Sequence, residues 1–269
     1  TVEGNFTADG GTIKLDGNYP VGTANVALGD AALDDGSLSG SYNTALGAAS
    51  FGNLTSGTAN LAVGAYAGQN HTTGSYNVFV GEEAAVGNTT GSSNTAVGRT
   101  ALYSNTTASY GTAVGFRAAY SNTTGADNTA MGGNSLYTNS TGNFNVASGY
   151  ASLRLNTTGS SNVGLGYEAL KSNTTASYNT AVGYQSLKAN TTATNNVSIG
   201  AFSLALNTTG EANTSVGLAA MDANTTGSNN VALGREALGG NTTASYNTAV
   251  GYQAGLNATT GSVNTFVGG

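Results

Sequence analysis

A five-residue pattern of one polar residue, three small or apolar residues and one glycine recurs along almost the whole chain. Its clearest copy is NTAVG at residues 179–183. The leading Asn, or the Gly that replaces it at 111, falls at residues 25, 43, 60, 77, 94, 111, 128, 145, 162, 179, 196, 213, 230, 247 and 264. The first spacing is 18 residues and every later one is 17. So fixed a period predicts a repeat architecture in which each unit packs only on its neighbours. We number the repeat positions 1 to 17 from this leading residue.

The first half of the repeat predicts a short strand that ends at a corner. Position 2 is mostly Thr or Val, position 3 is small and position 4 is a hydrophobe, as in Thr180, Ala181 and Val182. This run is too short for a helix and suits a strand. The Gly at position 5 predicts a corner where a side chain is excluded or φ is positive. The predicted corner residues are Gly98, Gly115, Gly132, Gly149, Gly166, Gly183, Gly200, Gly217, Gly234 and Gly251, and the predicted buried core column at position 4 is Val97, Val114, Met131, Leu165, Val182, Ile199, Val216, Leu233 and Val250.

The second half of the repeat predicts a return path to the next strand. Position 8 is Ala or Ser and position 9 is commonly Leu. Adjacent residues on a strand point opposite ways, so both faces of this half are expected to be small or apolar. The coil then closes through NTTG or NTTA, as at residues 105–108, a composition typical of turns. The alternative is a short helical turn over residues 184–189, although about six residues do not sustain a helix without packing.

These patterns together predict an all-β parallel β-solenoid of about 15 coils over residues 22–269. Residues 1–21 lie outside the period, and the alternation in Thr12 to Leu15 suggests a strand that caps the first coil. The chain breaks off inside a repeat at Asn264 to Gly269, so the solenoid is expected to continue beyond residue 269.

The Leu column at position 9 predicts that several chains assemble. A 17-residue coil with two short strands is too thin to cover both of its apolar faces, and strands that are apolar on two sides are normally covered on two sides. The column from Leu102 to Leu204 would be exposed in a monomer as a large apolar patch. A homotrimer would cover every copy alike.

Composition argues against an enzyme. Charged residues are 7% of the chain, Cys is absent and the net charge is −6. The acidic pairs Asp34-Asp35 and Glu82-Glu83 have no matching acids in the next coil, which favours solvated turn residues. The single His71 has no second His or Cys to form a metal site or a triad, and we expect a solvent-facing turn residue. We therefore predict no catalytic, cofactor or metal site.

The same composition limits the partners. No apolar stretch is long enough to span a bilayer, so membrane insertion is not expected. The seven Lys and Arg are scattered on a mildly acidic chain, and nucleic-acid binding would need a basic stripe.

The Asn-x-Ser/Thr pattern recurs with the repeat at position 12. In a secreted eukaryotic protein such residues would be glycan acceptors. The alternative is that each Asn caps its turn and stacks in a ladder of amide hydrogen bonds along the rod. The candidate acceptors are Asn88, Asn105, Asn122, Asn139, Asn156, Asn173, Asn190, Asn207, Asn224 and Asn241, with Asn53, Asn70 and Asn257 at three variant turns where the Asn comes one residue early.

The runs NTAVGRTA at residues 94–101 and NVALGREA at 230–237 resemble the head repeat of YadA-type trimeric autotransporter adhesins. The resemblance implies a left-handed parallel β-roll that assembles as a homotrimer. The runs NTAVGYQSLKANTT at 179–192 and GTIKLDGNYPVG at 11–22 are similar to repeat-bearing tail-fibre proteins of bacteriophages. The adhesin unit is shorter than 17 residues, and no coiled-coil stalk or membrane anchor is evident here.

These observations predict a structural fibre or adhesin shaft on a virion tail or cell surface, which mediates or presents attachment to a glycan or protein receptor. Exposed Tyr150, Tyr167, Tyr184 and Tyr252 are candidates for glycan contact, or they pack the corner. The alternative is a glycosylated extracellular filament or surface-layer repeat protein. An ice- or surface-binding solenoid is a further alternative, but it needs flat Thr arrays, and adjacent Thr such as residues 106 and 107 should diverge.

Overall fold

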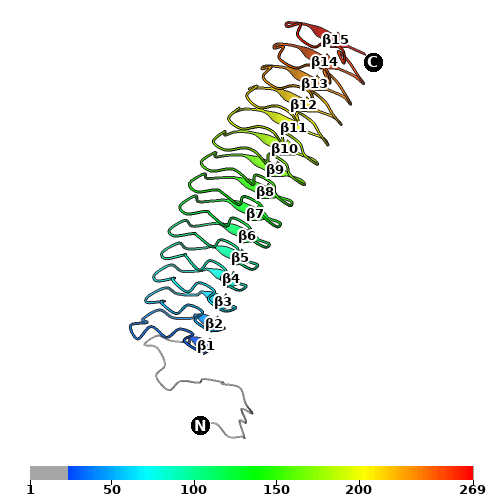
Figure 1. Cartoon of the computed structure of the whole chain (residues 1–269). Helices are drawn as coiled ribbons and strands as arrows, with labels where there is room; N and C mark the ends of the chain where they lie inside the picture. Colours follow the sequence, from blue (N-terminus) through cyan, green and yellow to red (C-terminus); the bar gives the residue numbers. More distant parts are fainter. Residues whose placement is uncertain (1–23, 269) are drawn as a thin grey trace, which may run out of the picture.

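The chain folds as one long parallel β-solenoid. The computed structural model describes residues 24–268, in which fifteen strands of three residues form one sheet whose spatial order equals the sequence order. The coils stack into a straight rod (Figure 1). Fourteen turns at roughly 4.8 Å each make a rod of about 70 Å. The strands are β1 (Val26–Leu28), β2 (Thr44–Leu46), β3 (Leu61–Val63), β4 (Val78–Val80), β5 (Thr95–Val97), β6 (Thr112–Val114), β7 (Thr129–Met131), β8 (Val146–Ser148), β9 (Val163–Leu165), β10 (Thr180–Val182), β11 (Val197–Ile199), β12 (Thr214–Val216), β13 (Val231–Leu233), β14 (Thr248–Val250) and β15 (Thr265–Val267).

The predicted solenoid and its period are confirmed. Each strand pairs in parallel with the strand one repeat away, so Thr180 lies beside Val197 and Val182 beside Ile199. The constant spacing keeps each repeat position in one column along the rod. The predicted capping segment at residues 1–21 lies outside the described residues. The alternative of a helical turn at residues 184–189 is wrong, because this stretch consists of turns.

The glycine column at position 5 forms the corner that follows each strand. The ten glycines predicted there have φ between +120° and +143°. At Gly166 a Cβ atom would meet the carbonyl group of Gly183 in the next coil. The corner therefore excludes a side chain for two reasons, the backbone conformation and the close approach of the neighbouring coil.

We expect Gly166→Val to destabilise the protein by at least about 1–3 kcal/mol through backbone strain. Urea unfolding followed by circular dichroism would measure the loss. The matched control is Gly133→Val, because a Cβ at Gly133 would lie 3.5 Å from its nearest neighbour atom, in Tyr150, and no positive φ constrains it. Equal stability of the two variants would contradict the close-packed corner.

The core column was assigned to the wrong strand position. The side chains at position 4, from Val97 to Val250, form a stacked column, but they lie on the outer face, and Met131, Ile199, Leu233 and Val250 are 38–47% exposed. The interior contains position 3, where Ala181 is fully buried, together with position 9, where Leu187 is fully buried. The two positions pack on each other, since a Cβ added at Gly164 in position 3 would touch Leu153 in position 9.

The second half of the coil does not alternate as a strand would. Ala169 at position 8 and Leu170 at position 9 are both fully buried. The reason is the backbone, because Glu168 and Leu170 have φ of +54° and +52°. Left-handed residues on either side of position 8 turn both side chains inward, so the alternation rule for extended chain does not apply.

The Leu column is consequently sealed within its own coil. Leu102, Leu136, Leu153, Leu170, Leu187 and Leu204 are at most 2% exposed in the single chain. The sequence argument that these Leu residues need neighbouring chains to cover them is therefore wrong. Any interface between copies must use another face.

Candidate functional site

Two ladders of buried asparagines hold the coils together. In the first ladder, at position 1, the backbone N–H of Asn179 donates to Oδ1 of Asn162 at 3.0 Å. In the second, at position 12, Nδ2 of Asn173 donates to Oδ1 of Asn156 at 2.8 Å. Within one coil, Asn162 and Asn173 both donate from Nδ2 to the carbonyl of Ala176, at 2.8 and 3.0 Å. The ladders thus satisfy buried backbone groups and tie each closing turn to its strand.

The second ladder is formed by the ten asparagines that were candidate glycan acceptors at position 12. They are 0–2% exposed. Because each amide is buried and donates to the previous coil and to its own turn, it has no access to a glycosyl donor. Their burial argues against the acceptor assignment, and the alternative, a ladder of amide hydrogen bonds along the rod, is what the structure shows. The three variant asparagines, Asn53, Asn70 and Asn257, are exposed.

His71 occupies a ladder position and is not a solvent-facing residue. In its coil the Asn comes one residue early, at the exposed Asn70, and the imidazole takes position 12 with no exposed surface. Its ring lies 5.5 Å from Phe51 and 5.8 Å from Phe79, measured between centroids. Phe79 has room because position 9 of the His71 coil is Gly68, where a Cβ would strike both Phe rings. The sequence expectation for His71 was therefore wrong.

The ladder also fixes the protonation of His71. Nε2 lies 2.9 Å from the carbonyl of Gly74, which can only accept, so Nε2 carries the proton. Nδ1 then accepts from Nδ2 of Asn88 at 2.8 Å. A second proton on Nδ1 would point at the Asn88 N–H group, which is itself a donor, so the charged imidazole is disfavoured. Burial lowers the pKa of His71 below its usual 6.5.

We expect this buried imidazole to make stability depend on pH. The unfolded chain takes up a proton near pH 6.5, whereas the folded chain resists it, so the His71 contribution is complete above pH 6.5 and is lost as pH falls below it. The loss is at most about 1.4 kcal/mol per pH unit. Unfolding free energies of wild type and His71→Asn between pH 7 and 5 would test this, and parallel curves would contradict it.

The acidic pairs do not form a site. Asp35 caps a turn by accepting from Ser37, which lowers the pKa of Asp35. Glu82 pairs with Arg99 of the next coil at 2.9 Å, and both side chains are exposed. Among residues 24–268 no group of three His, Cys, Asp or Glu residues could hold a metal ion.

One charged cluster does form, around Glu168. Lys171 lies 2.6 Å and Lys188 3.1 Å from its carboxylate, and Gln185 donates to it at 2.8 Å. The hydrogen bond from Lys171 is the main reason that the pKa of Glu168 falls to about 2. These bases are thus less scattered than the sequence suggested, but both are paired with the same acid.

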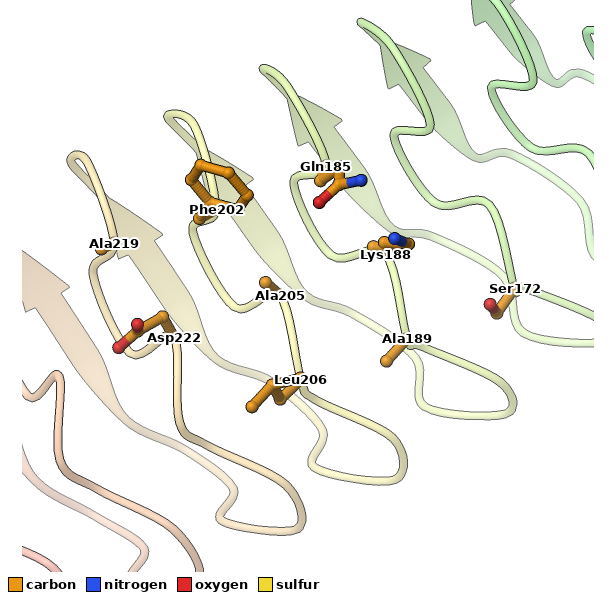
Figure 2. A pocket seen from close by; sticks show the side chains of 9 residues that line it. All are labelled: Ser172, Gln185, Lys188, Ala189, Phe202, Ala205, Leu206, Ala219 and Asp222. Carbon is orange, nitrogen blue, oxygen red and sulfur yellow. The ribbon is translucent and has the colours of Figure 1, made fainter.

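A shallow surface groove of about 430 Å³ lies beside this cluster. Figure 2 shows that its side chains come from successive coils, with Phe202 and Leu206 providing apolar surface and Lys188 and Asp222 lying toward opposite ends. Burial raises the pKa of Asp222. Since Gln185 and Lys188 are already bonded to Glu168, the polar groups do not converge on a shared point, and the groove lacks the features of an active site.

The corner tyrosines stack on one another. The ring centroids of Tyr150 and Tyr167 are 5.6 Å apart and those of Tyr167 and Tyr184 are 5.2 Å apart, in nearly parallel planes. Phe202 adds an edge contact to Tyr184. The rings remain 43–51% exposed, but their faces cover each other. This arrangement supports the packing interpretation of these residues over the glycan-contact one.

The outer face of the strands is a mainly apolar strip, interrupted at position 4 by Ser148, which we call the outer strand face. It consists of positions 2 and 4 of β1 to β15, such as Thr180 and Val182 in β10. These side chains are half-buried or exposed throughout. The Thr pairs of the closing turn form no comparable surface, because Thr106 is half-buried and donates its hydroxyl to the carbonyl of Thr123, while Thr107 is exposed.

A second exposed set of residues was missed at the sequence level. The last residue before each new repeat, which is position 17 and in the longer first coil position 18, is aromatic in every other coil over the first two thirds of the rod. The residues are Tyr42, Tyr76, Tyr110, Phe144 and Tyr178, followed after a gap by Tyr246. Testing the sequence for a 34-residue period, twice the repeat, would have found them.

The chain matches no family model, no curated protein and no solved structure. No helix within residues 24–268 could cross a membrane, since that part of the chain contains strands and turns only. The fold and the surfaces described above are thus the basis for any functional assignment.

Proposed function

We propose that the chain is a shaft segment of a homotrimeric fibre, on a phage tail or a cell surface, that mediates or presents attachment to a receptor. The single observation that carries the proposal is the outer strand face. Position 4 holds a hydrophobic residue in every strand except β8, where it is Ser148, and position 2 holds Thr, Val or Leu, along fifteen coils of a straight rod (Figure 1). Contiguous apolar strips of this kind on soluble proteins mark interaction sites.

The occupant of this strip is a second and a third copy of the chain. A partner must present an equally long, regular apolar surface with the same repeat along the rod, and another copy of the same solenoid does so. Closed rotational symmetry then gives every copy the same environment. The outer strand face, and not the Leu column, is therefore the interface between copies in this proposal. The resemblance to trimeric adhesin heads favours three copies.

The mechanical design also supports a shaft. Every coil is hydrogen-bonded to the next through the strands and turns, and the Asn ladders add bonds along most of the rod, with the position-12 ladder running from His71 to Asn241. Such a rod holds a constant direction over its length, as a spacer requires.

Sedimentation equilibrium would test the assembly, with an expected mass of three times 26.4 kDa. The double variant Val182→Lys, Val216→Lys places charges on the outer strand face and should yield monomers with unchanged β circular dichroism. The matched control Thr175→Lys, Thr209→Lys adds the same charges at exposed closing turns and should remain trimeric. A wild-type monomer at micromolar concentration would overturn the proposal, and a dimer would keep the interface but refute the trimer.

A glycosylated filament is the second candidate. The specific observation that favours it is the exposure of Asn53, Asn70 and Asn257, each in an Asn-x-Thr sequence. Mass spectrometry of the chain from its natural source would show glycan on these three residues and on none of the ladder residues. A chain without added sugar mass would exclude this candidate.

A further inference from the structure

We propose that the aromatic residues at position 17 form a binding site for an extended, uncharged β-1,4-linked polysaccharide. This aromatic row consists of Tyr42, Tyr76, Tyr110, Phe144 and Tyr178. The site adds a ligand class to the attachment role proposed above, and the argument for it holds whether the chain is a trimer or a monomer.

The first step is exposure. The side chains of the row are 62–69% exposed, more than those of the corner tyrosines. The corner tyrosines stack on one another, whereas no member of the row makes a ring–ring or cation–ring contact within the described part of the chain. Neighbouring members are two coils apart, which is too far for stacking. The exposed surface of each ring is therefore not covered by another ring or a cation and is available to a ligand.

The second step is that the fold does not need these rings. Position 17 is left-handed in every coil, with φ from +58° to +62° in the row, where a bulky side chain costs energy. The intervening coils have small or polar residues there, including Asp127 and Asn195. The backbone makes the same hydrogen bond whether the residue is aromatic or not. The N–H of Tyr110 donates to the carbonyl of Ser92 at 3.1 Å, and the N–H of Asp127 donates to the carbonyl of Ser109 at 3.2 Å. The requirements of folding therefore do not explain why large aromatic residues occur at this position.

The third step is spacing. Two coils at roughly 4.8 Å place successive rings about 9.6 Å apart along a straight line, and the row from Tyr42 to Tyr178 spans about 38 Å. A disaccharide in an extended β-1,4-linked chain covers about the length between two rings. Because alternate sugars of such a chain turn the same way, every ring would meet the same sugar face.

The fourth step is chemistry. The face of an aromatic ring is electron-rich and attracts the C–H groups on the apolar face of a pyranose. Tyrosine gives this contact at low entropic cost, since only two side-chain torsions must be fixed. Between the rings lie Ser93 and Ser161, whose hydroxyl groups can bond sugar hydroxyls. Asp127 is the one charged side chain at these positions, which favours an uncharged polymer.

Binding of the full chain to microcrystalline cellulose and to chitin tests the proposal, with starch as the control polymer because its α-linked chain coils. We expect retention on at least one β-linked polymer and none on starch. The row variant replaces Tyr76, Tyr110, Phe144 and Tyr178 with Asn, the residue that the chain itself has at 195 and 229. It should weaken retention on the order of tenfold or more without loss of unfolding free energy.

The matched control is the triple variant Tyr150→Ala, Tyr167→Ala, Tyr184→Ala, which removes aromatic surface from the corner and should bind as the wild type does. Ala212→Tyr fills the gap before Tyr246 and should strengthen retention. Failure of wild type to bind either β-linked polymer, or equal losses in the row and corner variants, would overturn the proposal. So would a change in sedimentation mass of the row variant, since the row would then be a contact between copies. The polymer-binding outcomes do not depend on whether the wild type is a trimer.

Discussion

Asn173→Asp is expected to destabilise the solenoid by about 3–5 kcal/mol at pH 7, the cost of leaving a buried charge without a partner. Asn173 has no exposed surface, and its Nδ2 donates to the Oδ1 of Asn156 and to the carbonyl of Ala176. A carboxylate at this point would place an oxygen against two acceptors. Urea unfolding at pH 7 would measure the loss.

The pH dependence of that variant provides a second readout. Desolvation should raise the pKa of the introduced carboxyl, so the folded state binds a proton more tightly than the unfolded state does. Stability should therefore recover as pH falls through this raised pKa, because the protonated acid can donate to one acceptor. Asn173→Leu, which imitates the buried Leu54 at the same position, should lose only about 1–3 kcal/mol at any pH.

The matched surface control is Asn70→Asp. Asn70 is exposed, and its Oδ1 accepts from Nδ2 of Asn53, a bond that a carboxylate can also accept. Its stability should stay within about 0.5 kcal/mol of wild type. If Asn173→Asp were equally mild at pH 7, the ladder would be open to solvent and the glycan-acceptor interpretation would return.

Leu187→Ala is expected to cost about 2–5 kcal/mol, through lost burial and the cavity that remains. Leu187 is fully buried, and a coil of this size has few other side chains that could move into the space. Thermal and urea unfolding would both report the change. The lost stability should be confined to the contacts between the coil of Leu187 and the coils on either side of it, because a repeat contacts only adjacent repeats.

Leu206→Ala makes the same chemical change at an exposed site and serves as the control. It should alter the free energy of unfolding by no more than about 0.5 kcal/mol. A mild effect of Leu187→Ala would mean that the Leu column is not the interior, and the earlier view of this column as a contact between chains would become tenable again.

The period of the sequence was sufficient to predict the solenoid, its parallel register and its corners. A constant 17-residue spacing leaves one way to align successive strands, and an invariant Gly at position 5 is needed wherever φ is positive and the next coil approaches. The amide ladder could also be anticipated, because an Asn that recurs at each turn must stack on its copies. These features depend on local conformation and on the repeat alone.

Which side chains face inward was decided only by the tertiary structure. Hydrophobicity favours Val182 over Ala181 for the core, yet Ala181 is inside, because position 3 faces the Leu column across an interior too narrow for a second large side chain. Left-handed residues such as Glu168 and Leu170 have no sequence signature, since neither is Gly or Asn, so the inward turn of both Ala169 and Leu170 could not be foreseen.

The burial of His71 has the same kind of cause. It depends on Phe51 and Phe79 from the coils on either side and on the space left by Gly68, three residues whose relation is visible only when the coils are stacked. The sequence therefore determined the axis of this protein and the spacing along it, because those follow from periodicity. The assignment of each column to the inside or the outside depended on the width of the coil, which is a property of the closed backbone and not of any one repeat position.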